Sequence, residues 1–154
     1  MYDNEKWDRR FLAVAKEVSS WSKDPSSQIG AVIVNELGQI VGTGYNGFPR
    51  GVDDSEDRYN NRELKYKMVV HAEANACLQA GAAARGGTIY VYPGWGSPCM
   101  CTDCAKTAIQ AGIKRSVGLI RKIDADKLAR WKESLELAQQ MCDEAGLKTD
   151  TYSD

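Results

Sequence analysis

One histidine and three closely spaced cysteines constrain how this chain can fold. His71 is the only histidine in the sequence, and Cys99, Cys101 and Cys104 lie together further along the chain. One imidazole and two thiolates satisfy the three protein ligands of a hydrolytic zinc site, which keeps its fourth position open for water. We therefore expect the fold to bring His71 to two of these cysteines, since binding by all three would close the open position.

A structural zinc site or a redox pair is the commoner meaning of two cysteines separated by two residues. A structural site would need a fourth ligand, which only Cys77 or Cys142 could provide. Both are better explained as small buried side chains. Glu73, two residues after His71, has no use beside a structural metal, whereas a hydrolytic site needs a group that carries protons. The motif therefore favours catalysis.

The same combination resembles the signature of the zinc-dependent deaminases. In these enzymes zinc activates water for attack on the amidine-like carbon of cytosine or adenine, and a glutamate that does not bind the metal carries the protons. The resemblance implies Zn2+ as the cofactor and Glu73 as the catalytic residue.

The first thiolate ligand is ambiguous from the sequence. Cys101 and Cys104 have the usual two-residue spacing, which places both sulfurs on one face of a first helical turn. In zinc deaminases, however, the first thiolate follows a proline, and here Pro98 precedes Cys99. We therefore predict His71, Cys99 and Cys104 as the zinc ligands, with Cys101 as the alternative to Cys99.

The composition indicates one domain and a small substrate. With 154 residues, 43% hydrophobic and 27% charged, the chain is long enough for a real core. A net charge of −1 gives no general attraction to polyanions, so no nucleic-acid partner is expected. No apolar run approaches the roughly 20 residues of a membrane span, and the first residues do not resemble a signal peptide. We expect a single domain over residues 1–154, in the cytoplasm and without a membrane partner.

The pattern of apolar residues predicts an α/β fold. Apolar residues recur every three or four positions in residues 4–20 and 125–145, which indicates amphipathic helices. Residues 46–62 show no period and are expected to form a loop. Further helices are expected at 71–81 and 104–111, and strands at 29–34, 39–45, 88–92, 115–120 and 147–152.

The order of these elements predicts how the strands pair. The short turn at residues 35–38 makes the first two strands an antiparallel hairpin. Helices connect the later strands, which implies parallel pairing among them with helices on the faces of the sheet. The sequence therefore predicts a mixed five-stranded sheet in a three-layer α/β/α arrangement.

Four blocks within residues 7–115 resemble the deoxycytidylate (dCMP) deaminase family. They are Trp21–Ala31, the glycine-rich segment Gly44–Gly51, Lys65–Ala76 and Cys104–Lys114. The resemblance implies a cytidine-deaminase-like fold and hydrolysis of dCMP to dUMP and ammonia for thymidylate synthesis. It also implies activation by dCTP and inhibition by dTTP, with Mg2+ beside the effector triphosphate, in a homohexamer.

The resemblance also implies where nucleotides bind. Asn46 corresponds to the asparagine that contacts the sugar or base, while Asn75 and the segment Gly44–Gly51 lie near the regulatory nucleotide. Cations are needed as well, because they make charge-assisted hydrogen bonds to phosphate. The residues predicted to bind substrate or effector are Lys23, Asn46, Gly47, Phe48, Arg50 and Asn75, and further candidate cations are Arg58, Arg62 and Lys65. Trp95 beside the metal motif either stacks on a base or covers the metal site.

Two other functions are compatible with the motif. A deaminase of another cytosine nucleotide or of a polynucleotide would share the metal site, but a polynucleotide enzyme would rest on a basic track with stacking aromatic residues. A catalytically silent nucleotide-binding zinc protein would share the fold. The near-zero net charge argues against the polynucleotide enzyme, and the intact Glu73 argues against the silent protein.

Overall fold

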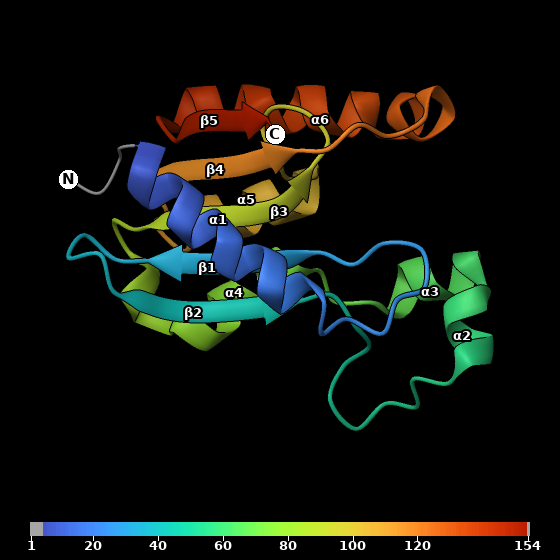
Figure 1. Cartoon of the computed structure of the whole chain (residues 1–154). Helices are drawn as coiled ribbons and strands as arrows, with labels where there is room; N and C mark the ends of the chain where they lie inside the picture. Colours follow the sequence, from blue (N-terminus) through green and yellow to red (C-terminus); the bar gives the residue numbers. More distant parts are fainter. Residues whose placement is uncertain (1–4, 154) are drawn as a thin grey trace.

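Five strands form one mixed sheet at the centre of the structure (Figure 1). The computed structural model describes residues 5–153. The strands are β1 (Gly30–Val34), β2 (Ile40–Tyr45), β3 (Thr88–Gly94), β4 (Arg115–Ile120) and β5 (Lys148–Ser153). Their order across the sheet is β2-β1-β3-β4-β5, with β1 antiparallel to both of its neighbours and with β3, β4 and β5 parallel. The predicted hairpin and the predicted parallel strands are both present.

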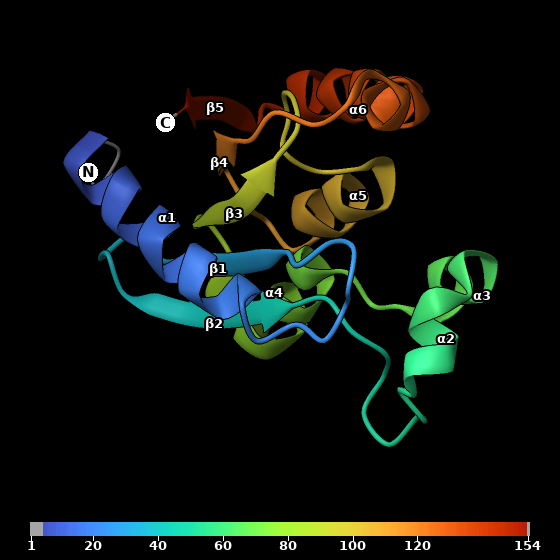
Figure 2. The same ribbon diagram turned by 45° about the vertical axis from the view of Figure 1, so that its right-hand side comes forward.

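Helices cover both faces of the sheet (Figure 1, Figure 2). The longer helices are α1 (Glu5–Ser19), α4 (Ala72–Ala80), α5 (Thr102–Gln110) and α6 (Ala125–Ala145). On one face, Phe11 and Leu12 of α1 belong to a core shared with β1, β3 and β4. On the other face, α4, α5 and α6 contribute to a second core. The predicted three-layer α/β/α fold is confirmed, and no helix within residues 5–153 has both the length and the apolar character of a membrane span.

The segment after β2 differs from the prediction. Residues 46–62 are not all loop, because they contain the short helix α2 (Glu56–Asn60), which is followed by α3 (Arg62–Met68). Both helices are too short for a helical period to stand out in the sequence. The Asn61 side chain accepts a hydrogen bond from the backbone of Leu64 and so caps α3. A 3-10 turn, η1 (Gly81–Ala84), follows α4, and α5 begins two residues earlier than expected.

Gly44 explains how α4 can lie directly on β2. A Cβ atom at Gly44 would collide with the carbonyl oxygen of Ala72 and would lie 2.5 Å from the backbone nitrogen of Ala76. This part of the glycine-rich segment therefore has a packing role. The close contact fixes the start of α4, where His71 is the N-cap, relative to the sheet.

A buried carboxylate joins α1 to three strands. The two oxygens of Asp8 accept hydrogen bonds from the guanidinium of Arg115 on β4, at 2.8 and 2.7 Å. Tyr90 on β3 and Tyr152 on β5 donate their hydroxyl hydrogens to the same carboxylate, and Arg115 also donates to Asp150. Burial alone would raise the pKa of Asp8, but the hydrogen bonds outweigh burial and lower it.

Asp8→Asn should lower the free energy of unfolding by about 3–5 kcal/mol, because it leaves the buried Arg115 charge without its main partner. An unfolded aspartate has a pKa near 3.9, and the folded pKa of Asp8 lies below its ordinary value. The carboxylate therefore stabilises fully above about pH 4, and its contribution is lost as the pH falls through the folded pKa. Urea unfolding measured from about pH 3 to about pH 7 gives the free energy of unfolding of both proteins. The difference in this free energy between wild type and variant should become smaller toward about pH 3.

Asp150→Asn is the matched control for this prediction. Asp150 bonds to the same guanidinium at 2.7 Å, but its side chain is 31% exposed whereas that of Asp8 is fully buried. We expect a clearly smaller loss of stability in this variant. Equal losses in the two variants, or a difference from wild type that does not change with pH, would contradict the proposed role of Asp8.

Candidate active site

Two helix starts bring the metal-binding side chains together. His71 is the N-cap of α4, Cys101 is the N-cap of α5, and Cys104 lies in the first turn of α5. The Nδ1 atom of His71 lies 3.2 Å from Cys104 Sγ and 3.5 Å from Cys101 Sγ. All three ligand atoms lie within 4.8 Å of one another. The fold thus places one nitrogen and two sulfur donors around one point.

This donor set fits zinc. Zn2+ binds imidazole nitrogen and thiolate sulfur at roughly 2.0–2.3 Å, so the ligand atoms of a tetrahedral site lie roughly 3.5 Å apart. The separations between His71 Nδ1 and the two sulfurs are close to that value. Three donors leave a fourth position for water, which is the arrangement of a hydrolytic site and not of a structural one.

Cys99, which the sequence favoured as the first thiolate ligand, is not part of this group. Its thiol donates a hydrogen bond to the carbonyl oxygen of Gly96 at 3.1 Å. It packs against β3 and β4 where Gly94 and Gly118 leave room, since a Cβ atom at either glycine would collide with the sulfur. Burial raises the pKa of Cys99 to about 12. The alternative, Cys101, is the cysteine that the fold brings to the other two donors.

The surroundings of Cys101 favour its thiolate form. Hydrogen bonds from Cys104 and, after it, from His71 lower the pKa of Cys101 to about 4, although burial opposes this shift. The hydrogen bond to Cys101 is also the main reason why the pKa of His71 rises to about 9. The pKa of Cys104 is raised, first because its thiol donates to Cys101. The group therefore already stabilises one deprotonated sulfur, which is the form that binds zinc.

Glu73 lies beside the group, in the first turn of α4. Its side chain is buried, with the residue 6% exposed, and burial raises its pKa. A buried carboxyl with a raised pKa holds a proton more readily than an exposed one, which suits a group that accepts and then donates a proton. Glu73 therefore has the properties of a proton carrier.

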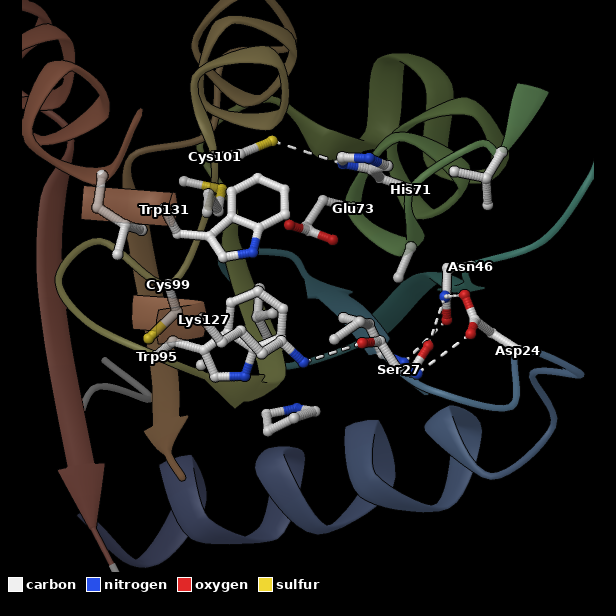
Figure 3. Close-up of a pocket in the computed structure, with 18 of the residues that line it drawn as sticks. Asp24, Ser27, Asn46, His71, Glu73, Trp95, Cys99, Cys101, Lys127 and Trp131 are labelled. Carbon is white, nitrogen blue, oxygen red and sulfur yellow. Dashed lines mark hydrogen bonds between the residues drawn. The ribbon is translucent and has the colours of Figure 1, made fainter. Parts of the chain in front are cut away.

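His71, Cys101 and Glu73 line one end of a pocket (Figure 3). In this view Cys101 and His71 lie at one end, Glu73 points inward, and Lys127 with Ser27 lies toward the other end. The pocket lining also includes the aromatic side chains of Tyr66, Trp95 and Trp131, the polar residues Asp24 and Asn46, and Lys65. The pocket can therefore hold a ring near Glu73 and still offer polar and cationic contacts to the rest of the same molecule.

The comparison with known sequences decides the family. Residues 5–120 match the model described as the cytidine and deoxycytidylate deaminase zinc-binding region. The chain belongs to this family. The matched residues include His71, Glu73, Cys101 and Cys104, so the three donors and the carboxylate all lie within the zinc-binding region.

Known relatives extend over most of this deaminase. It is 41% identical over 145 residues to an uncharacterized deaminase from the luxG 3′ region of Aliivibrio fischeri. The match covers 93% of this chain and 91% of that protein. It is 40% identical over 134 residues to the deoxycytidylate deaminase of Homo sapiens, which covers 81% of this chain and 71% of the human protein. The chain is a hydrolytic deaminase enzyme.

A solved structure has the same fold. The dCMP deaminase of the cyanophage S-TIM5, in complex with dCMP and dUMP, superimposes with a TM-score of 0.70 and covers 98% of both chains. The two sequences are 22% identical, so the likeness shows the fold of this deaminase.

Asn46 lies in the pocket wall of this deaminase, and its amide is already held by the backbone. Its Oδ1 accepts a hydrogen bond from the backbone nitrogen of Ile29 at 2.8 Å, and its Nδ2 donates to the carbonyl oxygen of Ser27 at 2.7 Å. These bonds fix the loop before β1 against the end of β2. A contact between Asn46 and the sugar or base of a substrate stays a prediction.

Most of the other predicted nucleotide-binding residues lie outside the pocket lining. Lys23 is exposed and forms an ion pair with Asp54 at 2.9 Å. Asn75 donates a hydrogen bond to the carbonyl oxygen of Tyr45. Gly47, Phe48, Arg50, Arg58 and Arg62 follow β2 and do not line the pocket, whereas Lys65 does. Their role in binding a nucleotide stays a prediction.

Three pocket residues on α6 were missed from the sequence. Lys127, Trp131 and Leu135 line the pocket and recur every four residues, which places them on one face of the helix. Trp131 packs against Trp95, with ring centroids 5.7 Å apart. The spacing is visible in the sequence, but no motif indicates that this face turns toward residues that lie tens of positions earlier in the chain.

Proposed function

We propose that this deaminase converts dCMP and water to dUMP and ammonia. The observation that carries the proposal is the group of three metal donors, His71, Cys101 and Cys104, at the end of a pocket that the buried Glu73 also lines. Relatives named deoxycytidylate deaminase, 40% identical in Homo sapiens and 42% identical in Mus musculus, support dCMP as the substrate. The enzyme would act as a single domain over residues 1–154, in pyrimidine nucleotide biosynthesis in the cytoplasm.

We propose His71, Cys101 and Cys104 as the ligands of the catalytic zinc. Their mutual distances and the low pKa of Cys101 support this set. When bound, zinc supplies a Lewis acid that makes water a better nucleophile near neutral pH. The two thiolates lie at the start of α5, where the positive end of the helix dipole favours negative charge.

Glu73 moves the protons in the proposed reaction. As the C–O bond forms at C4 of the cytosine ring, the carboxylate takes one proton from the attacking water and passes it to ring N3. It then carries the second proton of that water to the amine, the C4–N bond breaks, and ammonia leaves. The ring has become uracil, and Glu73 has returned to its ionised form. Burial of Glu73 supports this role because it brings the two protonation states closer in free energy.

The pocket fits a free nucleotide better than a polynucleotide. Trp95 and Trp131 form an aromatic wall beside the catalytic residues, which suits one ring. A polynucleotide enzyme needs a basic track that continues past the pocket, and the net charge of −1 offers no general attraction of that kind. A catalytically silent protein is disfavoured because the buried Glu73 lines the pocket beside the metal donors, where it can carry protons to and from a bound ring.

We further propose a regulated homohexamer, in which dCTP activates, dTTP inhibits and Mg2+ accompanies the effector triphosphate. The position of Lys23, Gly47, Phe48, Arg50 and Asn75 outside the pocket supports an effector role for them over a substrate role. Phe48 packs on Tyr59 of α2, with ring centroids 4.6 Å apart, so the segment after β2 is joined to this helix. Effectors that bind different subunit arrangements unequally would shift one shared equilibrium.

Ammonia release from five compounds tests the proposed function. We expect turnover of dCMP to exceed that of dCTP, CMP, deoxycytidine and a cytosine-containing oligonucleotide. The rate should then be measured against dCMP concentration with each triphosphate, with and without Mg2+. We expect dCTP to lower the dCMP concentration that gives the half-maximal rate and dTTP to raise it. The coupling should correspond to about 5- to 150-fold in affinity. Preference for the oligonucleotide, or no ammonia from dCMP, would reject the proposed substrate, and indifference to both triphosphates would reject only the regulation.

A further inference from the structure

Two lysines line the pocket, and one of them is already neutralised within the fold. Lys65 Nζ lies 3.2 Å from Asp24 Oδ2, and both side chains are buried, at 8% and 3% exposed. Lys65 also donates a hydrogen bond to Ser26 Oγ at 2.9 Å. The folded state loses much stability when one partner of a buried ion pair is left unpaired. Lys65 is therefore poorly suited to leave Asp24 and bind a ligand anion.

The second lysine, Lys127, has no carboxylate in ion-pair contact within the described part of the chain. Its Nζ donates a hydrogen bond to Ser27 Oγ at 3.0 Å and lies 4.3 Å from the centroid of the Trp95 ring. Both contacts are with uncharged groups, and one of them crosses from α6 to the loop before β1. The ammonium is therefore held at a defined place in the pocket while its charge stays unmatched.

The surroundings of Lys127 disfavour its charged form. Burial, followed by the nearby cation Arg130, lowers the pKa of Lys127, and Lys65 acts in the same direction. Asp124 and Asp24 act in the opposite direction but do not outweigh these effects. Asp124 is occupied as the N-cap of α6. An anion bound at Lys127 would stabilise its charged form, which burial and the neighbouring cations disfavour.

We infer that Lys127 binds the phosphate of a nucleoside monophosphate and so selects the nucleotide over its nucleoside. The inference rests on the proposed function, because it takes the ring of the substrate to lie beside Glu73. The phosphate then points away from the metal-binding end, toward Lys127 and Ser27 (Figure 3). An ammonium makes charge-assisted hydrogen bonds to phosphate oxygens. The Ser27 hydroxyl, which accepts from Lys127, can donate its own hydrogen to the same phosphate.

The test compares dCMP with deoxycytidine in the wild-type zinc enzyme and three lysine variants. Lys127→Gln should lower kcat/KM for dCMP by about 10- to 100-fold and leave kcat/KM for deoxycytidine nearly unchanged, because one charged hydrogen bond is lost. Lys127→Arg keeps the charge and should retain most of the activity toward dCMP. Lys132→Gln is the matched control, since Lys132 lies on the same helix with its side chain 73% exposed.

Binding of the product dUMP, measured by calorimetry, gives a second result that needs no turnover. Its affinity should fall by about 10- to 100-fold in Lys127→Gln and stay at the wild-type level in Lys132→Gln. Equal losses for dCMP and deoxycytidine, or unchanged dUMP binding in Lys127→Gln, would overturn the inference and leave Lys127 as a structural link between α6 and the pocket. Failure of the wild-type enzyme itself to act on dCMP would instead reject the proposed function.

Discussion

Replacing Glu73 by glutamine should reduce kcat by about 10²- to 10⁴-fold while zinc and substrate remain bound. The amide keeps the size of the side chain but cannot accept a proton from water or deliver one to the ring. Folding should not suffer, because burial already disfavours the ionised carboxylate and a neutral amide carries no such penalty. The measurements are steady-state kinetics with dCMP, zinc content per chain, and equilibrium binding of dCMP to the variant.

Glu63→Gln is the matched control for this prediction, because the Glu63 side chain is 84% exposed on α3. It should behave as wild type in all three measurements. A Glu73→Gln enzyme that turns over dCMP within about tenfold of wild type would rule out Glu73 as the proton carrier. Loss of zinc in this variant would show that the carboxylate supports the metal site.

Cys101→Ser should abolish zinc binding and activity, whereas Cys99→Ser should retain both. A serine hydroxyl is not deprotonated near neutral pH and is a poor substitute for a thiolate ligand. In Cys99→Ser the hydroxyl can still donate to the carbonyl oxygen of Gly96, as the thiol does at 3.1 Å. Zinc content per chain and kcat with dCMP separate the two variants.

Thermal unfolding with and without a chelator provides an independent measurement. Metal binding stabilises the folded state by mass action, so the chelator should lower the melting temperature of the wild type and of Cys99→Ser. It should have little effect on Cys101→Ser. Cys142→Ser, which removes a buried thiol that is not part of the donor group, controls for the loss of any cysteine. Full zinc content in Cys101→Ser together with its loss in Cys99→Ser would restore Cys99 as the ligand.

The secondary structure and the chemistry of the site follow from local patterns in the sequence. The apolar spacing of residues 4–20 and 125–145 is matched by α1 and α6, each of which contributes buried residues to a core. The hairpin and the parallel strands follow from the lengths of the connections between strands, which limit how neighbouring strands can pair. The family also follows from short motifs, because the residues around His71 and Glu73 are contiguous in the chain.

The tertiary structure alone decided which residues from distant segments meet. The proline before Cys99 suggested this thiol as a ligand, but Gly94 and Gly118 open a space between β3 and β4 into which its sulfur packs. The helix start then leaves Cys101 facing His71. The short helices α2 and α3 were also not predicted, because neither is long enough to show a marked apolar period.

Lys127 is the clearest example of a residue whose neighbours only the tertiary structure decides. In the sequence it is one of two lysines on a long helix, and its spacing from Trp131 indicates a shared face but not what that face contacts. Its position beside Ser27 and Trp95 depends on how α6 packs after β4, which brings together segments from three separate parts of the chain. Periodicity and motifs determine local structure and donor chemistry, because both depend on neighbouring residues. The composition of the pocket depends on long-range packing, which local sequence patterns do not specify.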